Sequence, residues 1–510
     1  MNNSRVKNSL RNSVWGVLNR FVMLLGPFVF RAIIIRYIGA QYVGLNGLFK
    51  SILNMLNMTE LGFGTSIVFM MYKPIADGNK DEVCQLLNLM RTVYRYVGVT
   101  VLILGCCFIP FLNILVKNDT GADVNVYLLY GMYLFHTVVS YLMFAYRVSI
   151  FTAHQRNDIV VKISLITEIT TYTLQAIALY TTRNYYIYLF VYTIMIIPQN
   201  IMYYIVSRKM YPDLHCGDKP TKDQIGVLKS KIGPLMLHRV GGKVIVSIDD
   251  MIISAILGVT FLTQYDNYYY IASSLVGTLG ILRNGIVASI GNKVYTDSIN
   301  NTYYAYKRIT FIWIGIVGWC AACLAGLYQP FIRLWVGEKY VYNTASMLSI
   351  VAYFFLWQFR YIGVTMKDSA GLWEPDRYKP IIGSIINLVA SIVMVKITGS
   401  VLGVLYPTMF VMLFIYFPWE TFALFKHLFK RSSKDYLLLV GRCFITSFAA
   451  IAATYYVGVM IGGTSIVRFI IRMAACAITA ACVYVLLNIR SKEFNGSINM
   501  VLGIFRKHKK

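Results

Sequence analysis

Charged side chains interrupt one long apolar stretch near the middle of the chain, residues 231–275. The stretch begins KIGPLMLHRVGGKVIVSIDDMIISAILG and is long enough to cross a bilayer as a helix. At about 100° per residue, Arg239, Lys243 and Asp250 fall within roughly 40° of one another around the helix axis. A charge at the centre of a spanning helix costs about 2.5–3.5 kcal/mol, so this face must meet water or protein rather than lipid.

The first two apolar stretches repeat this arrangement. Arg20 and Arg31 fall on one side of the first predicted helix together with Pro27, which removes one helix hydrogen bond midway. The second stretch carries a polar stripe over an arc of roughly 120°. Its members are Asn46, Lys50, Asn54, Asn57 and Glu60. The fifth stretch adds Ser164, Glu168, Thr171 and Gln175 at helical spacing, and later stretches add the single cations Arg283 and Arg360.

Ionisable groups inside a membrane protein either pair with one another and hold helices together, or line a polar cavity. Because cations outnumber acids on these faces, we expect the cations to bind an anionic group. The candidates are Arg20, Arg31, Arg239, Lys243, Arg283 and Lys50. Two roles stay open for Glu60, Asp249 and Asp250: an ion pair with a nearby cation, or coupling of transport to H⁺ or Na⁺. The sequence contains no catalytic constellation, nucleotide-binding loop or metal-ligand cluster, so we expect neither a cofactor nor a bound metal.

Composition places these residues in an all-α polytopic membrane protein. Hydrophobic residues make up 57% of the 510 and charged residues only 14%. Apolar runs of about 20 residues recur along the whole chain, whereas a β-barrel would show shorter alternating segments. We predict about 14 spans. The net charge of +26 would suggest nucleic acid in a soluble protein, but most lysines and arginines lie between the spans, which excludes that partner.

The distribution of lysine and arginine predicts the orientation in the membrane. About 32 of them fall in segments on the side of the N-terminus and about five on the other side. By the positive-inside rule, both termini are cytoplasmic. Arg36, Arg468 and Arg472 are exceptions, because they lie near the outer ends of their predicted helices.

A linker and a short internal repeat divide the chain into two lobes. The dipeptide Ile38-Gly39 ends the first span, and Leu257-Gly258 ends the seventh, so parallel six-span lobes would surround a central cavity. We predict four segments: an N-terminal lobe at 1–206, a cytoplasmic linker at 207–231, a C-terminal lobe at 232–430, and two additional spans with a basic tail at 431–510.

Several segments, in this order, resemble the Wzx-type polysaccharide flippases of the multidrug/oligosaccharidyl-lipid/polysaccharide exporter superfamily. They are FVFRAIIIRYIGAQYVGLNGLF, TELGFGTSIVFMMYKPIADG, DDMIISAILG followed by QYDNYYYIASSL, and RLWVGEKY. The resemblance implies two six-helix lobes, two extra C-terminal helices and alternating access. It implies a lipid-linked substrate, usually an undecaprenyl-diphosphate-linked oligosaccharide, in the bacterial cytoplasmic (inner) membrane. Polysaccharide polymerase machinery would then be a downstream partner, in an O-antigen, capsule or exopolysaccharide pathway.

Two alternatives have different sequence requirements. A multidrug exporter of the same superfamily would need an acidic cavity for cationic drugs, and the excess of cations argues against it. A membrane-embedded sugar polymerase or glycosyltransferase generally needs a sizeable loop outside the membrane. The longest outer loop predicted here has about 15 residues, so we expect a transporter rather than an enzyme.

Overall fold

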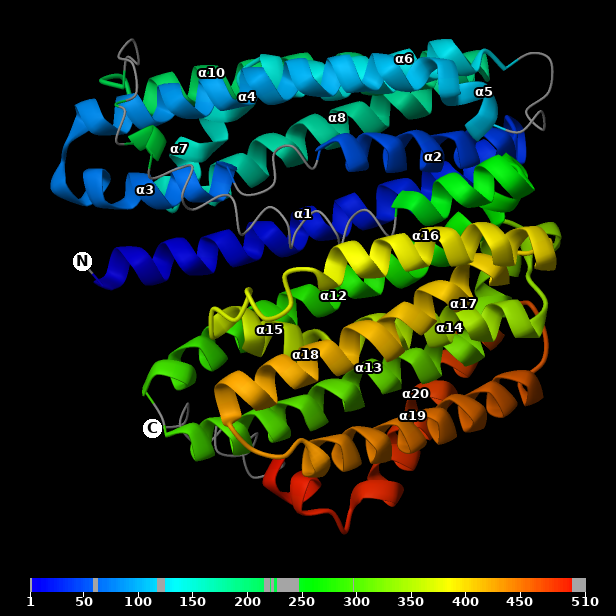
Figure 1. Ribbon diagram of the computed structural model, residues 1–510. Helices are drawn as coiled ribbons and strands as arrows, with labels where there is room; N and C mark the ends of the chain where they lie inside the picture. Colours follow the sequence, from blue (N-terminus) through cyan, green and yellow to red (C-terminus); the bar gives the residue numbers. More distant parts are fainter. Residues whose placement is uncertain are drawn as a thin grey trace. The chain divides into compact units, whose positions relative to one another are not determined.

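The computed structural model describes residues 2–57, 63–116, 124–214, 221, 224–226, 247–296 and 298–497. Within these ranges the chain consists of helices and short connections, with no β-strand (Figure 1). The predicted all-α fold is therefore confirmed. Contacts divide the chain into two compact units, unit 1 at Met1–Thr263 and unit 2 at Gln264–Lys510. The lobe and linker boundaries given above stay a prediction.

Nine helical segments in the described ranges are long and apolar enough to cross a membrane, or ten if a bent pair counts as one span. The bent pair joins Val126–Leu142 to Ala145–Ala153 at 49°. The nine are Leu18–Tyr37, Lys80–Leu115, Tyr185–Met210, Ile299–Trp335, Thr344–Ser369, Lys379–Thr398, Leu402–Phe429, Lys434–Met460 and Ile466–Asn488. Each falls on a predicted span. The total of 14 stays a prediction. The expected second and seventh spans include residues outside the described ranges, and the expected fifth and eighth spans, at 160–181 and 266–290, are not among the nine.

Unit 1 contains ten labelled α-helices before the segment at 247–252. They are α1 (Asn2–Tyr37), α2 (Ala40–Leu56), α3 (Phe63–Asp77), α4 (Lys80–Phe108), α5 (Leu112–Leu115), α6 (Val126–Leu142), α7 (Val148–Ala153), α8 (Asn157–Thr182), α9 (Tyr185–Ile194) and α10 (Ile196–Met210). Short 3-10 turns, η2 (Ile109–Phe111) and η3 (Ala145–Arg147), join some of them. A π-helix, η4 (Ile253–Leu257), precedes α12 (Val259–Thr296), whose first turns complete unit 1.

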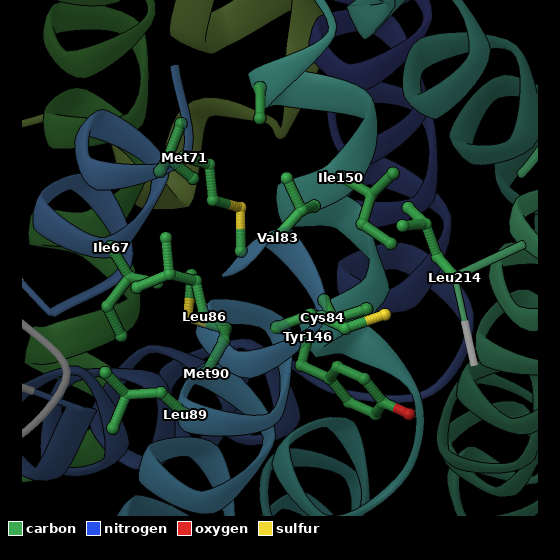
Figure 2. Packing of buried hydrophobic residues seen from close by; sticks show 13 residues of the cluster. Ile67, Met71, Val83, Cys84, Leu86, Leu89, Met90, Tyr146, Ile150 and Leu214 are labelled. Atoms are coloured by element: carbon green, nitrogen blue, oxygen red, sulfur yellow. The ribbon is translucent and has the colours of Figure 1, made fainter. Parts of the chain in front are cut away.

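One end of unit 1 has a core where α3, α4 and α7 meet. Figure 2 shows Ile67 and Met71 of α3, Leu86 of α4 and Ile150 of α7, which belong to one cluster of buried side chains. The turn between α3 and α4 is made by Gly78, which has a φ of +72°, a value that suits glycine. Asn79 then caps α4, because its side chain accepts a hydrogen bond of 3.2 Å from the backbone N–H of Glu82.

The two repeat positions have the same local geometry. Gly39 and Gly258 have φ values of +144° and +114°, and a new helix begins at the next residue in both cases. The two new helices also touch each other. Thr263 Oγ1 of α12 donates to the carbonyl oxygen of Ala40 at 2.8 Å. In return, a Cβ on Gly44 of α2 would lie only 2.4 Å from the carbonyl oxygen of Val259, so glycine is needed at this crossing.

The internal repeat relates these two contacts, Thr263 with Ala40 and Gly44 with Val259, to each other. An offset of 219 residues relates Gly39 to Gly258, and the same offset relates Ala40 to Val259 and Gly44 to Thr263. The starts of α2 and α12 therefore cross through equivalent residues, which supports the internal repeat.

Unit 2 contains the rest of α12 and eight further labelled helices. They are α13 (Ile299–Trp335), α14 (Thr344–Gln358), α15 (Tyr361–Ser369), α16 (Lys379–Thr398), α17 (Leu402–Phe410), α18 (Phe417–Ala423), α19 (Lys434–Met460) and α20 (Ile466–Asn488), with a 3-10 turn η5 (Glu338–Tyr340) and π segments η6 (Val411–Tyr416) and η7 (Leu424–Phe429). Small residues bring α13 and α19 close together, since a Cβ on Gly458 would lie 2.9 Å from Gly326 Cα. Thr454 strengthens this crossing through a 2.7 Å hydrogen bond to the carbonyl oxygen of Ala322.

Candidate functional site

The two arginines of the predicted anion-binding set that lie on α1 are both half-buried. Between them, Gly26 allows α8 to approach α1, because a Cβ there would lie 2.3 Å from Tyr172 Cε2. Phe30 continues this contact, with its ring centre 5.4 Å from that of Tyr172. The face of α1 that carries Arg20 and Arg31 thus belongs to a helix held firmly against its neighbour.

Tyrosines from α6 and α9 lie beside Arg31 and the first half of α2. Arg31 is within electrostatic range of the Tyr185 hydroxyl. That hydroxyl lies 3.1 Å from the Tyr133 hydroxyl, which donates to Asn46 Oδ1 at 2.8 Å. Tyr42 stacks on Tyr185 with ring centres 4.4 Å apart. The polar stripe predicted on α2 therefore begins with a hydrogen-bonded contact to buried phenols rather than to lipid.

Lys50, one turn further along α2, is the most accessible cation of the described unit 1 set. Its Nζ lies 6.0 Å from the ring centre of Tyr192, and the His136 ring stacks on that tyrosine at 4.2 Å. Glu168 of α8 is within electrostatic range of Lys50 and also forms a hydrogen bond with Tyr172. We call Lys50, His136, Glu168 and Tyr192 the Lys50 group. It combines a cation, a carboxylate and flat rings, which is a suitable surface for a sugar with charged substituents.

The two aspartates of the seventh stretch are buried, with 1% of Asp249 and 5% of Asp250 exposed. Ser51 of α2 donates a hydrogen bond to Asp250 Oδ2, which ties the segment at 247–252 to α2. Ser254 continues the attachment, because its hydroxyl donates to the carbonyl oxygen of Leu115 at 2.7 Å. These contacts give Asp250 a structural partner and leave its role in coupling a prediction.

Three of the predicted residues, Arg239, Lys243 and Glu60, lie outside the described residues. Arg283 lies in unit 2, on α12, where its guanidinium sits 4.4 Å from the ring centre of Tyr361. The structure therefore places Arg20, Arg31 and Lys50 in one unit and Arg283 in the other. The proposed binding role of the whole set stays a prediction.

Unit 2 contains a buried ion-pair network that sequence analysis missed. Arg360 donates to both carboxylate oxygens of Glu420, with Nε 3.1 Å from Oε2. Lys379 bridges Glu420 Oε1 and Asp376 Oδ2, at 2.7 Å from each. Lys367 completes the network with contacts of 3.0 and 2.7 Å to the two oxygens of Asp376.

This network joins α15, α16 and α18 with three cations and two carboxylates, all 14% exposed or less. Of its members, the sequence had drawn attention only to Arg360, and the structure assigns it to pairing. The available signal was Glu420, an acid within an otherwise apolar predicted span. Asp376 lies in the connection between α15 and α16, outside the spans. Burial raises the pKa of Asp376, but the positive charges of Lys379 and Lys367 outweigh this effect and hold that pKa below its ordinary value of 3.8.

Comparison with known proteins identifies the family to which the chain belongs. A family model described as polysaccharide biosynthesis protein matches residues 9–283, more than half of the chain. The chain belongs to the polysaccharide biosynthesis protein family. Every residue of the predicted binding and coupling set lies within the matched region, whereas the ion-pair network of unit 2 lies beyond it. No curated protein sequence matches the chain.

The chain shares its fold with solved transporters. The chain is similar to the lipid II flippase MurJ in its inward closed conformation, with a TM-score of 0.60 at 15% identity, over 93% of this chain and 98% of that one. It is also similar to an inward-facing multidrug resistance MATE family transporter of the MOP superfamily, with a TM-score of 0.59 at 12% identity, over 81% and 99% of the two chains. An outward-facing MATE family transporter gives 0.52 at 14% identity, over 84% and 97%.

These similarities confirm the resemblance seen in the sequence. The chain is a member of the polysaccharide biosynthesis protein family, and its fold is the one found in a lipid II flippase and in multidrug resistance MATE family transporters. The long apolar helices of the described ranges are those of a multi-pass membrane protein. At 12–15% identity the solved structures establish the fold alone.

Proposed function

We propose that this protein is a flippase for an undecaprenyl-diphosphate-linked oligosaccharide repeat unit. It would move the unit from the inner to the outer leaflet of the bacterial cytoplasmic membrane by alternating access, for assembly of a surface polysaccharide. The observation that carries this proposal is the pair of half-buried arginines on α1, inside the region matched by the family model. A pair of cations on a span suits a substrate whose headgroup is a diphosphate.

Physical chemistry favours arginine for this task. A diphosphate and several sugars cannot pass through hydrocarbon unless protein polar groups replace their water, although the lipid tail can stay in the bilayer. Arginine can give two parallel, charge-assisted hydrogen bonds to phosphate oxygens, whereas lysine acts as a point charge. The tyrosines beside Arg31 and the rings of the Lys50 group add stacking surfaces of the kind that sugars use.

The spacing on α1 suggests two successive positions for the headgroup. Arg20 and Arg31 are eleven residues apart on one continuous helix, which corresponds to about 16 Å along its axis. They therefore line different depths of the membrane. With the N-terminus in the cytoplasm, the headgroup would meet Arg20 first and Arg31, with its tyrosine neighbours, nearer the outer side.

Coupling to a cation gradient is a second part of the proposal. Glu60, Asp249 and Asp250 are its candidates, because a carboxylate in a cavity of low dielectric can bind H⁺ or Na⁺. Transport by Asn or Gln variants that still follows an imposed gradient would remove these residues from coupling. The Ser51→Ala variant is the control for Asp250, since it removes the observed contact without removing the carboxylate.

The proposed orientation has an independent test. Asn343 and Lys434 are both exposed, and the lysine and arginine distribution places them outside and inside respectively. In a background without the exposed native cysteines, an impermeant maleimide added to intact cells should label Asn343→Cys and spare Lys434→Cys. Labelling in the reverse pattern would overturn the topology.

A leaflet assay tests the proposed activity itself. Purified protein in vesicles, loaded with lipid-linked oligosaccharide in one leaflet, should move the unchanged molecule to the other leaflet. Elongated sugar product would instead indicate a polymerase, and gradient-driven movement of a cationic dye without sugar transport would indicate a multidrug exporter.

A further inference from the structure

One cavity in unit 2 carries an unexplained positive charge. Its volume is about 340 Å³, and it lies where α13, the loop after it, the start of α14, the end of α19 and the start of α20 meet. Arg333 and Arg472 line it, and among the described residues no carboxylate does. Arg472 is one of the arginines that departed from the charge distribution expected for the outer side of the membrane.

Three buried polar atoms around this cavity have no hydrogen-bond partner among the residues that the structure describes. They are Arg472 Nε, Gln329 Oε1 and the Tyr342 hydroxyl. Only 5% of Arg472 is exposed. Of its three guanidinium nitrogens, the structure shows one, Nη2, donating a hydrogen bond, to the carbonyl oxygen of Ile461. A buried arginine with an unused donor is costly, because its desolvation is not repaid. The remaining contact must therefore come from something that occupies the cavity.

The charges favour an anion as that occupant. Arg333 pairs with Glu338 at 2.7 Å, at a surface position where 71% of the Glu338 side chain is exposed. Within the described part of unit 2, Arg472 has no carboxylate at ion-pair distance, so the two arginines and one acid leave a net charge of about +1. Thr344, the first residue of α14, and Thr464, two residues before α20, also line the cavity, and helix N-termini attract anions.

We propose that this cavity binds a phosphate group with a single negative charge, through Arg472 and Arg333. A volume of about 340 Å³ is at the lower end of the range for ligand pockets, which suits a headgroup or a small anion. The phosphate can come from an anionic phospholipid of the surrounding leaflet or from free phosphate. Both would offer oxygens to Arg472 Nε and the Tyr342 hydroxyl. The site lies outside the family-matched region and does not depend on the transport substrate.

Binding to the full-length protein in detergent tests this site. Native mass spectrometry would count bound dihexanoylphosphatidylglycerol, with neutral dihexanoylglycerol as the lipid control. Wild-type protein should hold the phosphate lipid and not the neutral one. Displacement by millimolar inorganic phosphate, at constant ionic strength, would assign the site to free phosphate, and resistance to displacement would assign it to the lipid headgroup.

Three variants separate the proposed site from its surroundings. Arg472→Gln should weaken binding about ten-fold or more, because it removes a charge-assisted contact from a buried position. Arg468→Gln is the matched control: Arg468 is exposed one turn earlier on α20, donates to the carbonyl oxygen of Gly462 at 3.4 Å, and should bind as wild type. Glu338→Gln should bind more tightly, since it frees Arg333 at an exposed position where folding is not at risk.

The result that overturns the proposal is equally specific. Water alone could fill the cavity, and then neither lipid nor phosphate would bind differently to wild type, Arg472→Gln and Glu338→Gln. If Arg472→Gln fails to fold, an unchanged affinity in Glu338→Gln would by itself refute the proposed role of the arginine pair.

Discussion

Removing one charge from the buried ion-pair network of unit 2 should destabilise the protein by an amount that depends on which charge is removed. Glu420 accepts from both Arg360 and Lys379, so Glu420→Gln leaves the three cations of the network with Asp376 as its one buried carboxylate. Breaking a buried ion pair by removing one partner costs about 3–5 kcal/mol. The side chain of Glu420 is only 3% exposed, which gives no reason to reduce that estimate for solvent screening.

The expected result is a large loss of stability in Glu420→Gln and a smaller one in Arg360→Gln. The smaller loss follows because Lys379 still neutralises Glu420 when Arg360 is absent. The double variant should recover part of the loss, since the Arg360 charge no longer lies buried without its acid. Midpoints of thermal unfolding in one detergent, together with the amount of protein in the membrane, would measure these differences.

Glu374→Gln is the matched control, because Glu374 is an exposed acid in the connection between α15 and α16, two residues before Asp376 of the network. Its midpoint should stay within the error of the wild type. Equal midpoints for Glu420→Gln and Glu374→Gln would refute the network as a source of stability. A full loss in the double variant, with no recovery, would show that Arg360 and Glu420 do not act as a pair.

Two further predictions follow from other contacts. Gly44→Val should reduce the amount of folded protein, because its Cβ would lie 2.4 Å from the Val259 carbonyl oxygen at the α2–α12 crossing, whereas Gly131→Val, with open space around its Cβ position, should not. Asp376→Asn should destabilise the protein by an amount that is constant from about pH 5 to 8. The pKa of Asp376 is lowered on folding, so its contribution is complete above the ordinary value of 3.8 and disappears only as the pH falls through the lower value of the folded state. A difference from wild type that already shrinks between pH 7 and 5 would contradict this assignment.

The sequence predicted the helices well because a membrane imposes length and apolarity on every span. It also located the helix breaks at Gly39 and Gly258, and the positive φ values there explain why glycine stands at both positions. Helical periodicity predicts which residues share a face, but not which neighbouring helix that face meets. Pairings between distant residues were therefore beyond reach, as Ser51 with Asp250, 199 residues apart, and Arg360 with Glu420, 60 apart, illustrate.

The candidate site shows the same division. Periodicity correctly placed Arg20 and Arg31 on a helix that carries a proline between them, and it gave α2 a polar stripe. It did not predict the phenol neighbours of Arg31 or the stack of His136 on Tyr192, because tyrosines are common in spans for reasons of packing alone. In the sequence, the only sign of the cavity was Arg472, an arginine near the outer end of its predicted helix.

The most direct test of the central proposal is the rate of lipid-linked oligosaccharide transfer in vesicles by Arg31→Gln, Arg31→Lys and wild-type protein at equal reconstituted amounts. If Arg31 binds the diphosphate, the Gln variant should lose most of the transfer while remaining folded, and Lys should restore only part of it, because it supplies the charge without the paired hydrogen bonds. Wild-type rates from well-folded Gln variants of both Arg31 and Arg20 would contradict the proposed headgroup site.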